Sequence, residues 1–441
     1  MVRKHTVLAG ALLSASITNG AWAQQGEELR IEDAVRLALS RNERAKIADL
    51  NVVVADAAVA RARTAFFPTV LVTGSYTQKP DDVVDPKRAQ GSIINSATAS
   101  LGSTAALNQP LLNASSIMLY AQAKQIAYGT EAQTVDDKRV LGFDAAKAFF
   151  AALSADAVLT AANTRLTTAQ ANLNDTQERV NARIVSTNDA TRAQIDLANA
   201  QHEVESDKGV VQIAYLALAF TINAAVPAKL ATPASLLAAG RAPVPQADSL
   251  VKLAIATRPD LASKRHLAFA AHDFAREPLL RLIPTLNLVG TFALSTDETL
   301  ATHGFYNTEQ LGLALAWPLF DGGVRYADKR SRDAQASIAD LTTDTLVRSV
   351  DAQVREAVAA LVSSQSALDA AARALDAAKR SADETTVHYK QGLAKAIELV
   401  DANDSRFLAE VSFITAEYSV ALAYLALRQA VGVDAIGGEL R

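Results

Sequence analysis

The decisive stretch of this sequence runs from Val324 to Gln391 and reads VRYADKRSRDAQASIADLTTDTLVRSVDAQVREAVAALVSSQSALDAAARALDAAKRSADETTVHYKQ. These 68 residues between Gly323 and Gly392 contain neither glycine nor proline, the residues that most readily end a helix. At 1.5 Å per residue they predict a helical rod of ~100 Å. Apolar residues recur in it at spacings of three, four and seven, as in a coiled-coil seam, namely at Val347, Val350, Val354, Val358, Leu361, Leu368 and Leu375.

The rod has a return arm, and the first half of the chain repeats the pair. After the Gly392 turn, helical sequence continues from Leu393 to about Val431. The first half has a rod from Asn113 to Ala182 and a return arm to about Asn223. Each half therefore predicts a helical hairpin far longer than the average globular helix of ~11 residues.

Shorter motifs show that the duplication extends beyond the hairpins. The segment 66–74, FFPTVLVTG, has a counterpart in 282–290, LIPTLNLVG, and LNQPLL at 107–112 is answered by AWPLF at 316–320. Each first motif follows a helical stretch, Ile31 to Thr64 or Ser249 to Arg281. We therefore expect two structural repeats, each with a helix, two strands and a long hairpin, at 24–225 and 249–441. The segment 226–248 has four prolines and is expected to link them.

The paired motifs belong to segments with the pattern of membrane β-strands. Leu311, Leu313, Leu315, Trp317 and Leu319 alternate with small residues, as in a strand with one lipid-facing side. Periodicity alone equally allows a β-hairpin packed on a soluble core. The joining segments, 77–96 and 295–309, are long and polar, as extracellular barrel loops are. An open strand edge cannot face lipid, so four strands per chain predict an oligomer with eight, twelve or sixteen strands from two, three or four chains.

The N-terminus and the composition indicate an exported protein. Residues 1–23 combine Arg3 and Lys4 with a short apolar stretch and end in AWA, which predicts a cleaved signal peptide. Its removal leaves 41 basic against 47 acidic residues, a net charge of −6, so we expect no binding to nucleic acid. The sequence has no cysteine, which excludes disulfides, thiolate metal sites and a lipoprotein anchor on cysteine.

The two strand pairs, each with its proline-containing motifs, and the two long hairpins resemble the TolC-like outer-membrane efflux proteins over nearly all of the mature chain. The resemblance implies a mainly helical protein with four strands per chain, assembled as a homotrimer. Three chains would form a twelve-stranded barrel in the outer membrane and a helical barrel across the periplasm. It further implies a passive exit duct for efflux or type I secretion, coupled by a periplasmic adaptor (membrane fusion) protein to an inner-membrane RND or ABC transporter.

The most specific patch for this resemblance is YKQGLAKAIELVDA at 389–402. It is similar to the family's tip of the second hairpin, where a tyrosine precedes a glycine turn and two acids follow. Glu398 and Asp401 are three residues apart on a helix and so share one face. If that face lines the pore, as the resemblance implies, three chains would present six carboxylates in a cation-selective ring. Without the resemblance, the same two acids are read as solvated surface residues.

The first hairpin's tip, VNARIVSTND at 180–189, departs from the family because Arg183 stands where glycine is usual. The resemblance implies that Arg183, Ile184, Gly392 and Leu393 contact the adaptor. It also implies that Asp189 and Tyr389 latch the closed entrance. The sequence does not decide whether an ion pair contributes to the same latch, because the position of the family's basic residue is occupied by an alanine with a lysine next to it.

No catalytic or cofactor motif accompanies these features. The histidines lack metal-site spacing, and the sequence contains neither a GxSxG elbow nor a glycine-rich phosphate loop. We expect no metal, no cofactor and no enzymatic activity. The rival hypothesis is a soluble periplasmic coiled-coil protein with structural or adaptor duties.

Overall fold

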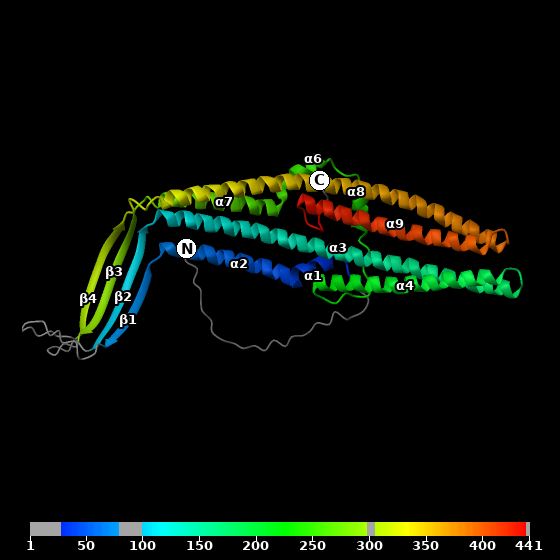
Figure 1. Ribbon diagram of the computed structural model, residues 1–441, viewed down its shortest axis with the longest axis horizontal. Coiled ribbons are helices and arrows are strands. Elements are labelled where there is room, and N and C mark those ends of the chain that lie inside the picture. The colour runs from blue at the N-terminus through cyan, green and yellow to red at the C-terminus, as the bar shows by residue number, and fades with distance from the viewer. Residues whose placement is uncertain (1–27, 79–98, 298–304, 438–441) are drawn as a thin grey trace, which may run out of the picture.

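The computed structural model describes residues 28–78, 99–297 and 305–437. A four-stranded sheet lies at one end of the molecule. At the other end are two tight turns, each of which joins a pair of helices, and long helices connect the two ends (Figure 1). The predicted fold class, mainly helical with four strands per chain, is confirmed. The predicted signal peptide at 1–23 and the middle of both strand-joining segments lie outside the described residues.

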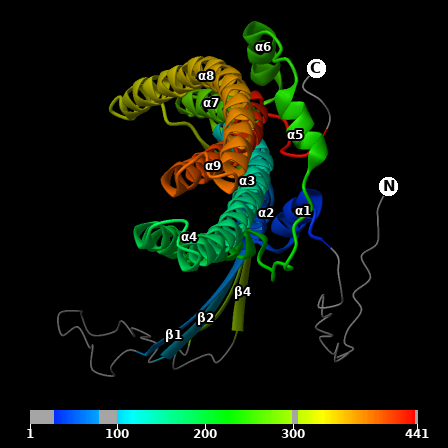
Figure 2. The same ribbon diagram turned by 90° about the vertical axis from the view of Figure 1, so that its right-hand side faces the viewer.

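Two hairpins of long helices form the body of the molecule. The first consists of α3 (Ala114–Asn181) and α4 (Thr187–Ile222), and the second of α8 (Val324–Lys390) and α9 (Ala396–Val431). The predicted seam of α8 is buried at Val350, Val354, Leu361 and Leu368, where it faces α9 and α6 (Ala247–Thr257). Viewed along the long axis, α8, α9, α3 and α4 follow one another in an arc (Figure 2).

The shorter helices thicken the half nearer the sheet. Helix α2 (Glu43–Arg63) packs on α3, and α7 (Pro259–Leu280) packs on both α3 and α8. The sequence predicted one helix from Ile31 to Thr64, but the chain breaks at Asn42, so that α1 (Ile31–Arg41) is a separate element. The Asn42 side chain accepts a hydrogen bond from the Arg44 amide and donates one to the Thr221 carbonyl, which stabilises the break. Likewise Arg258 separates α6 from α7.

The predicted linker at 226–248 contains a helix, α5 (Ala234–Arg241), which sequence reasoning missed among the prolines. At the C-terminal end of α5, the carbonyls of Gly240 and Ala242 accept hydrogen bonds from the Gln365 side chain of α8. A Cβ atom at Gly240 would lie 3.2 Å from Val420 of α9, so the absence of a side chain allows close packing. Helices α1, α5 and α6 all lie on the convex side of the arc (Figure 2).

The sheet is antiparallel throughout, in the order β1 (Thr69–Gln78), β2 (Ala99–Leu112), β3 (Thr285–Asp297), β4 (Phe305–Ala316). Strand β4 ends at Ala316, earlier than the alternation to Leu319 predicted. The segment after it turns instead toward α8, and Arg325 donates to the Pro318 carbonyl. Within the described sheet β1 and β4 are the two edges, and every residue of β1 is exposed.

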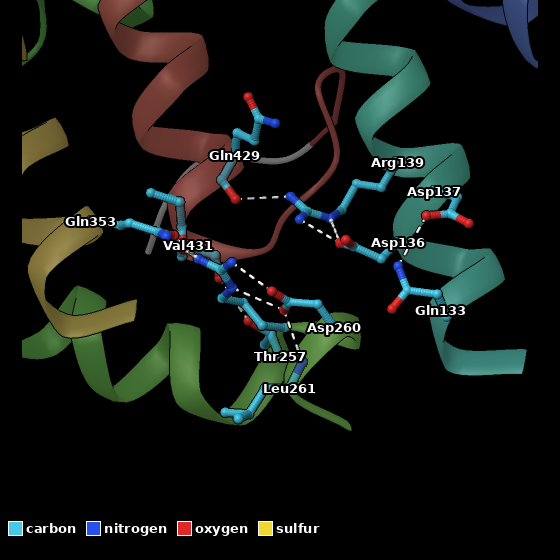
Figure 3. Close-up of polar contacts among 12 residues, drawn as sticks. Gln133, Asp136, Asp137, Arg139, Thr257, Asp260, Leu261, Gln353, Gln429 and Val431 are labelled. Carbon is cyan, nitrogen blue, oxygen red and sulfur yellow. Dashed lines mark hydrogen bonds and ion pairs between the residues drawn. The ribbon is translucent and has the colours of Figure 1, made fainter. Parts of the chain in front are cut away.

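The last turn of α9 is anchored by side chains from the neighbouring helices (Figure 3). Arg139 donates to the Gln429 carbonyl at 2.9 Å, Arg258 to the Ala430 carbonyl at 3.1 Å and Thr257 to the Val431 carbonyl at 2.9 Å. Carbonyls in the last turn of a helix lack the amide partners that a following turn would supply, and the two guanidinium groups also match the negative end of the helix dipole. The second hairpin is thereby fixed at its root to α3, α6 and α7.

A buried carboxylate joins α7 to α8 close to the sheet. The Glu277 side chain is 4% exposed and pairs with Arg281 of the following turn and with Arg332 of α8. Arg281 pairs in addition with Asp328 of α8. Removing one partner from such a buried network leaves an uncompensated charge, which costs far more than losing a surface ion pair.

We therefore predict that Glu277→Ala destabilises the folded protein by roughly 3–5 kcal/mol, because two arginines lose their buried counter-charge. Thermal loss of the helical circular-dichroism signal in detergent measures the effect. Glu384→Ala on exposed α8 surface is the matched control and should change stability by less than about 0.5 kcal/mol. Equal melting temperatures for the two variants would contradict the structural role given to Glu277.

Candidate functional site at the helical tips

The two hairpins end in turns of the same backbone conformation, although the left-handed residue is glycine in one and arginine in the other. Gly392 has a φ of 76° and Arg183 a φ of 60°, both in the left-handed region. In each turn the next amide reaches back across five residues, from Leu393 to His388 at 2.8 Å and from Ile184 to Arg179 at 2.9 Å. This is the usual way for a helix to end on a left-handed residue. Arg183 therefore takes the glycine conformation at a cost of ~1–2 kcal/mol.

Each tip presents an apolar side chain directly after its left-handed residue. Ile184 is 69% exposed and Leu393 is 74% exposed. Both side chains are therefore largely uncovered within one chain. The residues predicted to contact an adaptor are thus placed together, at the end of the molecule farthest from the sheet (Figure 1).

The two acids predicted to line the pore lie in the first two turns of α9. Glu398 and Asp401 are both exposed. The Glu398 carboxylate accepts a hydrogen bond of 3.3 Å from the Lys395 amide, so it also caps its own helix. The ring predicted from three chains remains a prediction.

Tyr389 joins the two hairpins, but through residues that sequence reasoning missed. Its side chain is buried, and its hydroxyl lies 3.2 Å from the Thr176 hydroxyl on α3. Arg179 stacks over the Tyr389 ring at 4.6 Å and donates to the Tyr389 carbonyl at 3.2 Å. Thr176 and Arg179 are one helical turn apart, but the sequence carries no signal that this face of α3 meets α8.

Asp189 has a different partner within the chain. Its carboxylate accepts a hydrogen bond of 3.2 Å from the Ser186 amide and completes a capping box at the start of α4. The structure therefore does not join Asp189 to Tyr389 within one chain. A latch between Asp189 and Tyr389 stays a prediction.

A second charged contact between the hairpins lies about five turns from the tip along α3 and about three turns from it along α9. Arg165 of α3 pairs with Asp196 of α4 at 3.2 Å and with Asp404 of α9 at 2.7 Å. Its guanidinium lies 5.1 Å from the centre of the Phe407 ring. Burial raises the pKa of Asp196 and the Asp404 carboxylate raises it further, against the opposing effect of Arg165. The contact borders a cavity of about 30 Å³, which is room for one or two water molecules.

Two of the four histidines in the described part of the chain lie next to polar side chains. His266 lies 2.9 Å from Gln125, and His272 lies 2.9 Å from Asp340. Over the described ranges, no group of three or more histidine, aspartate and glutamate side chains is arranged to hold a metal ion.

The family assignment follows from the whole length of this arrangement. The sequence profile of the family described as "Outer membrane efflux protein" matches residues 34–224 and 250–433, which lie within the two predicted repeats. The chain belongs to this family. It is an outer-membrane efflux protein. The rival hypothesis of a soluble coiled-coil protein is not favoured.

Solved structures share the fold at low sequence identity. MtrE of Neisseria gonorrhoeae, an outer-membrane channel solved in its open state, is 21% identical with a TM-score of 0.75, over 92% of this chain and 91% of that one. VceC of Vibrio cholerae is 15% identical with a TM-score of 0.75, over 92% and 96%. The Campylobacter jejuni channel CmeC is 15% identical with a TM-score of 0.76, over 97% and 94%. No match was found among curated protein sequences.

These matches bear on the other sequence-based predictions. The outer-membrane location and the resemblance to TolC-like channels are confirmed. The family and the fold are those of channel proteins, which are not known as enzymes, and which work together with partner proteins.

The unusual turn at Arg183 gives a test of the tip geometry. Arg183→Gly should stabilise the first tip by about 1 kcal/mol, because glycine adopts positive φ without steric cost. Gly392→Ala should destabilise the second tip by a similar amount. Hydrogen exchange of peptides covering each tip measures both effects, with slower exchange around residue 183 and faster exchange around residue 392. Faster exchange in Arg183→Gly would show that the arginine side chain itself holds the turn.

Proposed function

We propose that three copies of this efflux protein close into one passive duct, with a twelve-stranded barrel in the outer membrane and a helical barrel in the periplasm. The observation that carries the proposal is the pair of open edges of the described sheet, β1 and β4. Unpaired amides facing lipid cost several kcal/mol each, so these edges require partners. The four strands alternate in direction, so β4 of one copy can pair antiparallel with β1 of the next.

The two faces of the sheet support a membrane barrel with a watery interior. Residues directly opposite one another in an antiparallel sheet share a face. One face is rich in large apolar side chains: Val70, Val72, Tyr76, Leu101, Leu107, Leu286, Leu288, Phe292, Leu294, Leu311, Leu313 and Leu315. The other is mostly small or polar: Thr69, Thr73, Ser75, Thr104, Asn108, Asn287, Thr291, Ser295, Thr308, Gln310, Gly312 and Ala314. The exceptions include Leu71 and Val289 on the polar face and Gln109, Asn307 and Glu309 on the apolar face.

Exposed apolar side chains also line the two edges of the helical arc. At one edge α4 carries Val210, Ile213, Leu216 and Phe220, of which Phe220 is 84% exposed, and α2 carries Ile47, Leu50, Val53 and Val54. At the other edge α8 carries Ile338, Leu341 and Val362. Two different apolar edges on one subunit fit a head-to-tail contact, which closes into a ring when the rotation per subunit divides a full turn.

The tips are the proposed docking surface for the periplasmic adaptor. Ile184 and Leu393 are exposed, and Arg183 and Gly392 shape the turns that present them. The adaptor would connect the duct to an inner-membrane RND or ABC transporter, which would supply the energy. In this arrangement the apolar face of the sheet contacts the lipid of the outer membrane.

The first test is the mass of the assembly in detergent, which should correspond to three chains. Phe220→Glu should reduce the trimer fraction because it places a charge in the middle of the proposed edge contact. Leu39→Glu on α1, which lies on the convex side of the arc, is the matched control and should leave assembly unchanged. A stable monomer of the unaltered chain would contradict the barrel.

The second test concerns the proposed selectivity ring of Glu398 and Asp401. Glu398→Gln combined with Asp401→Asn should reduce cation preference in planar bilayers and weaken block by trivalent cations, because six charges leave one narrow ring. The matched control removes the same total charge from exposed positions far from the tips, through Glu131→Gln with Glu356→Gln. Unchanged selectivity in the tip variant would place these residues outside the pore.

A further inference from the structure

The ends of α2 and α3 next to the sheet carry positive charge without acidic residues nearby in the sequence. Arg61, Arg63 and Lys124 are the charged residues of the described ranges 57–78 and 99–130, which contain no aspartate or glutamate. The chain as a whole has more acidic than basic residues. This part of the surface therefore attracts anions, whereas the protein as a whole does not.

The packing of α2 on α3 brings Arg63 and Lys124 to the same level. The two helices run antiparallel, and Lys138 of α3 pairs with Asp49 of α2 at 2.5 Å. Lys124 lies two heptads before Lys138, and Arg63 lies two heptads after Asp49, so both steps lead toward the sheet. The groove position that holds an ion pair farther from the sheet therefore holds two cations next to it.

Aromatic rings hold these two cations in place. The Arg63 guanidinium lies 5.3 Å from the centre of the Phe67 ring, and Lys124 Nζ lies 5.9 Å from the centre of the Tyr120 ring. The Tyr120 ring also meets the Phe66 ring edge to face, with the ring centres 6.0 Å apart. A ring face attracts a cation but leaves its charge in place. The rings therefore orient the two cations without neutralising them.

The two cations lie on the convex side of the helical arc. Lys124 Nζ lies 5.8 Å from the centre of the Tyr128 ring. Tyr128 is two heptads from Gly142, so both are on one face of α3, and a Cβ atom at Gly142 would lie 3.5 Å from Val35 of α1. Helix α1 is on the convex side (Figure 2). The cations thus face the outside of the proposed duct and not its lumen.

The second repeat shows which group the first repeat lacks. Counted from the proline of each paired motif, Lys124 corresponds to Arg332, and Arg61 corresponds to Glu277. In the second repeat, Arg332 pairs with the buried Glu277. In the first repeat both places are occupied by cations. A bound anion would supply the counter-charge that a carboxylate supplies in the second repeat.

The neighbours of the two cations favour a lipid over a soluble anion. Ile117 lies one heptad from Lys124 toward the sheet and is 50% exposed, and Val70 on the apolar face of β1 is 68% exposed. In the other direction the next charged residues, Asp56 and Glu131, are acidic. From the sheet downward the surface is therefore apolar, then cationic, then acidic. The first two zones match the acyl chains and the phosphate of a phospholipid in the inner leaflet.

We propose that Arg63 and Lys124 bind the phosphate of an anionic glycerophospholipid in the inner leaflet of the outer membrane, one lipid per chain. The phosphate lies between the two cations, and the acyl chains extend past Ile117 along the apolar face of the sheet. The proposal rests on the contact of the sheet with lipid proposed above. The site is formed by a single chain, so it does not depend on how many chains assemble.

Native mass spectrometry of the purified full assembly in detergent, titrated with phosphatidylglycerol, tests the site. Arg63→Gln combined with Lys124→Gln should weaken binding on the order of tenfold, because two charge-assisted contacts with the phosphate are lost. Arg63→Lys combined with Lys124→Arg keeps both charges and should retain binding. The matched control, Arg373→Gln with Lys379→Gln, removes two exposed cations from the part of α8 near the tips and should leave binding unchanged.

Three results would overturn the lipid site. The first is equal affinity of the Arg63→Gln, Lys124→Gln variant and the unaltered chain for phosphatidylglycerol. The second is equally tight binding of phosphatidylcholine, whose headgroup has no net charge. The third is displacement of phosphatidylglycerol by an equal concentration of inorganic phosphate, which would indicate a site for a soluble anion. Monomers that bind phosphatidylglycerol through these two residues would contradict the three-chain duct and support the lipid site, so the two failures are distinguishable.

Discussion

The requirement that backbone amides in lipid be paired determines the rest of this structure. Four strands leave two edges open, and the edges lie on opposite sides of the described sheet. A chain that met this requirement alone would need many more strands. In the proposed assembly each chain supplies the pairing groups for its neighbours, so the helical part must present its own apolar edges in line with those of the sheet. The arc of α8, α9, α3 and α4 has the form that such a subunit needs (Figure 2).

The strength of packing falls from the root of the hairpins to their tips. At the root, arginines satisfy the last carbonyls of α9, and burial of Asp260 would raise its pKa, but hydrogen bonds and charge from Arg258 outweigh this and lower it. Farther along the hairpins, Arg165 pairs with the carboxylates of Asp196 and Asp404. At the tip, one tyrosine serves as the main link between hairpins. A duct that must remain anchored in a membrane and yet admit cargo at its far end requires this order of strengths.

The sequence predicted α8 well because its signal is a single uninterrupted property, the absence of breakers over 68 residues. Helix α3 contains Gly129 and Gly142, and was predicted because the first half of the chain repeats the order of the second. The turn at Gly392 is marked by its glycine, and the turn at Arg183 by its place at the end of the corresponding rod in the first half of the chain. The helix break at Asn42 was not predicted, because it depends on a carbonyl of Thr221 that lies 179 positions away. Helix α5 was missed because the prolines around it mark its boundaries and give no sign of the helix between them. The partners of Tyr389 escaped prediction for a related reason: residue spacing fixes which residues share a face of α3, but not which helix that face meets.

The equivalence of the two tip turns has a consequence for any partner that binds there. Three chains with two near-identical turns each would offer six binding positions around one axis, so that the rim has approximate sixfold symmetry imposed on true threefold symmetry. The positions differ in one respect, because Arg183 places a positive charge where Gly392 has no side chain. A partner made of identical subunits would thus meet two alternating kinds of position. It could either occupy one kind and ignore the other, or occupy all six and bind with two unequal affinities.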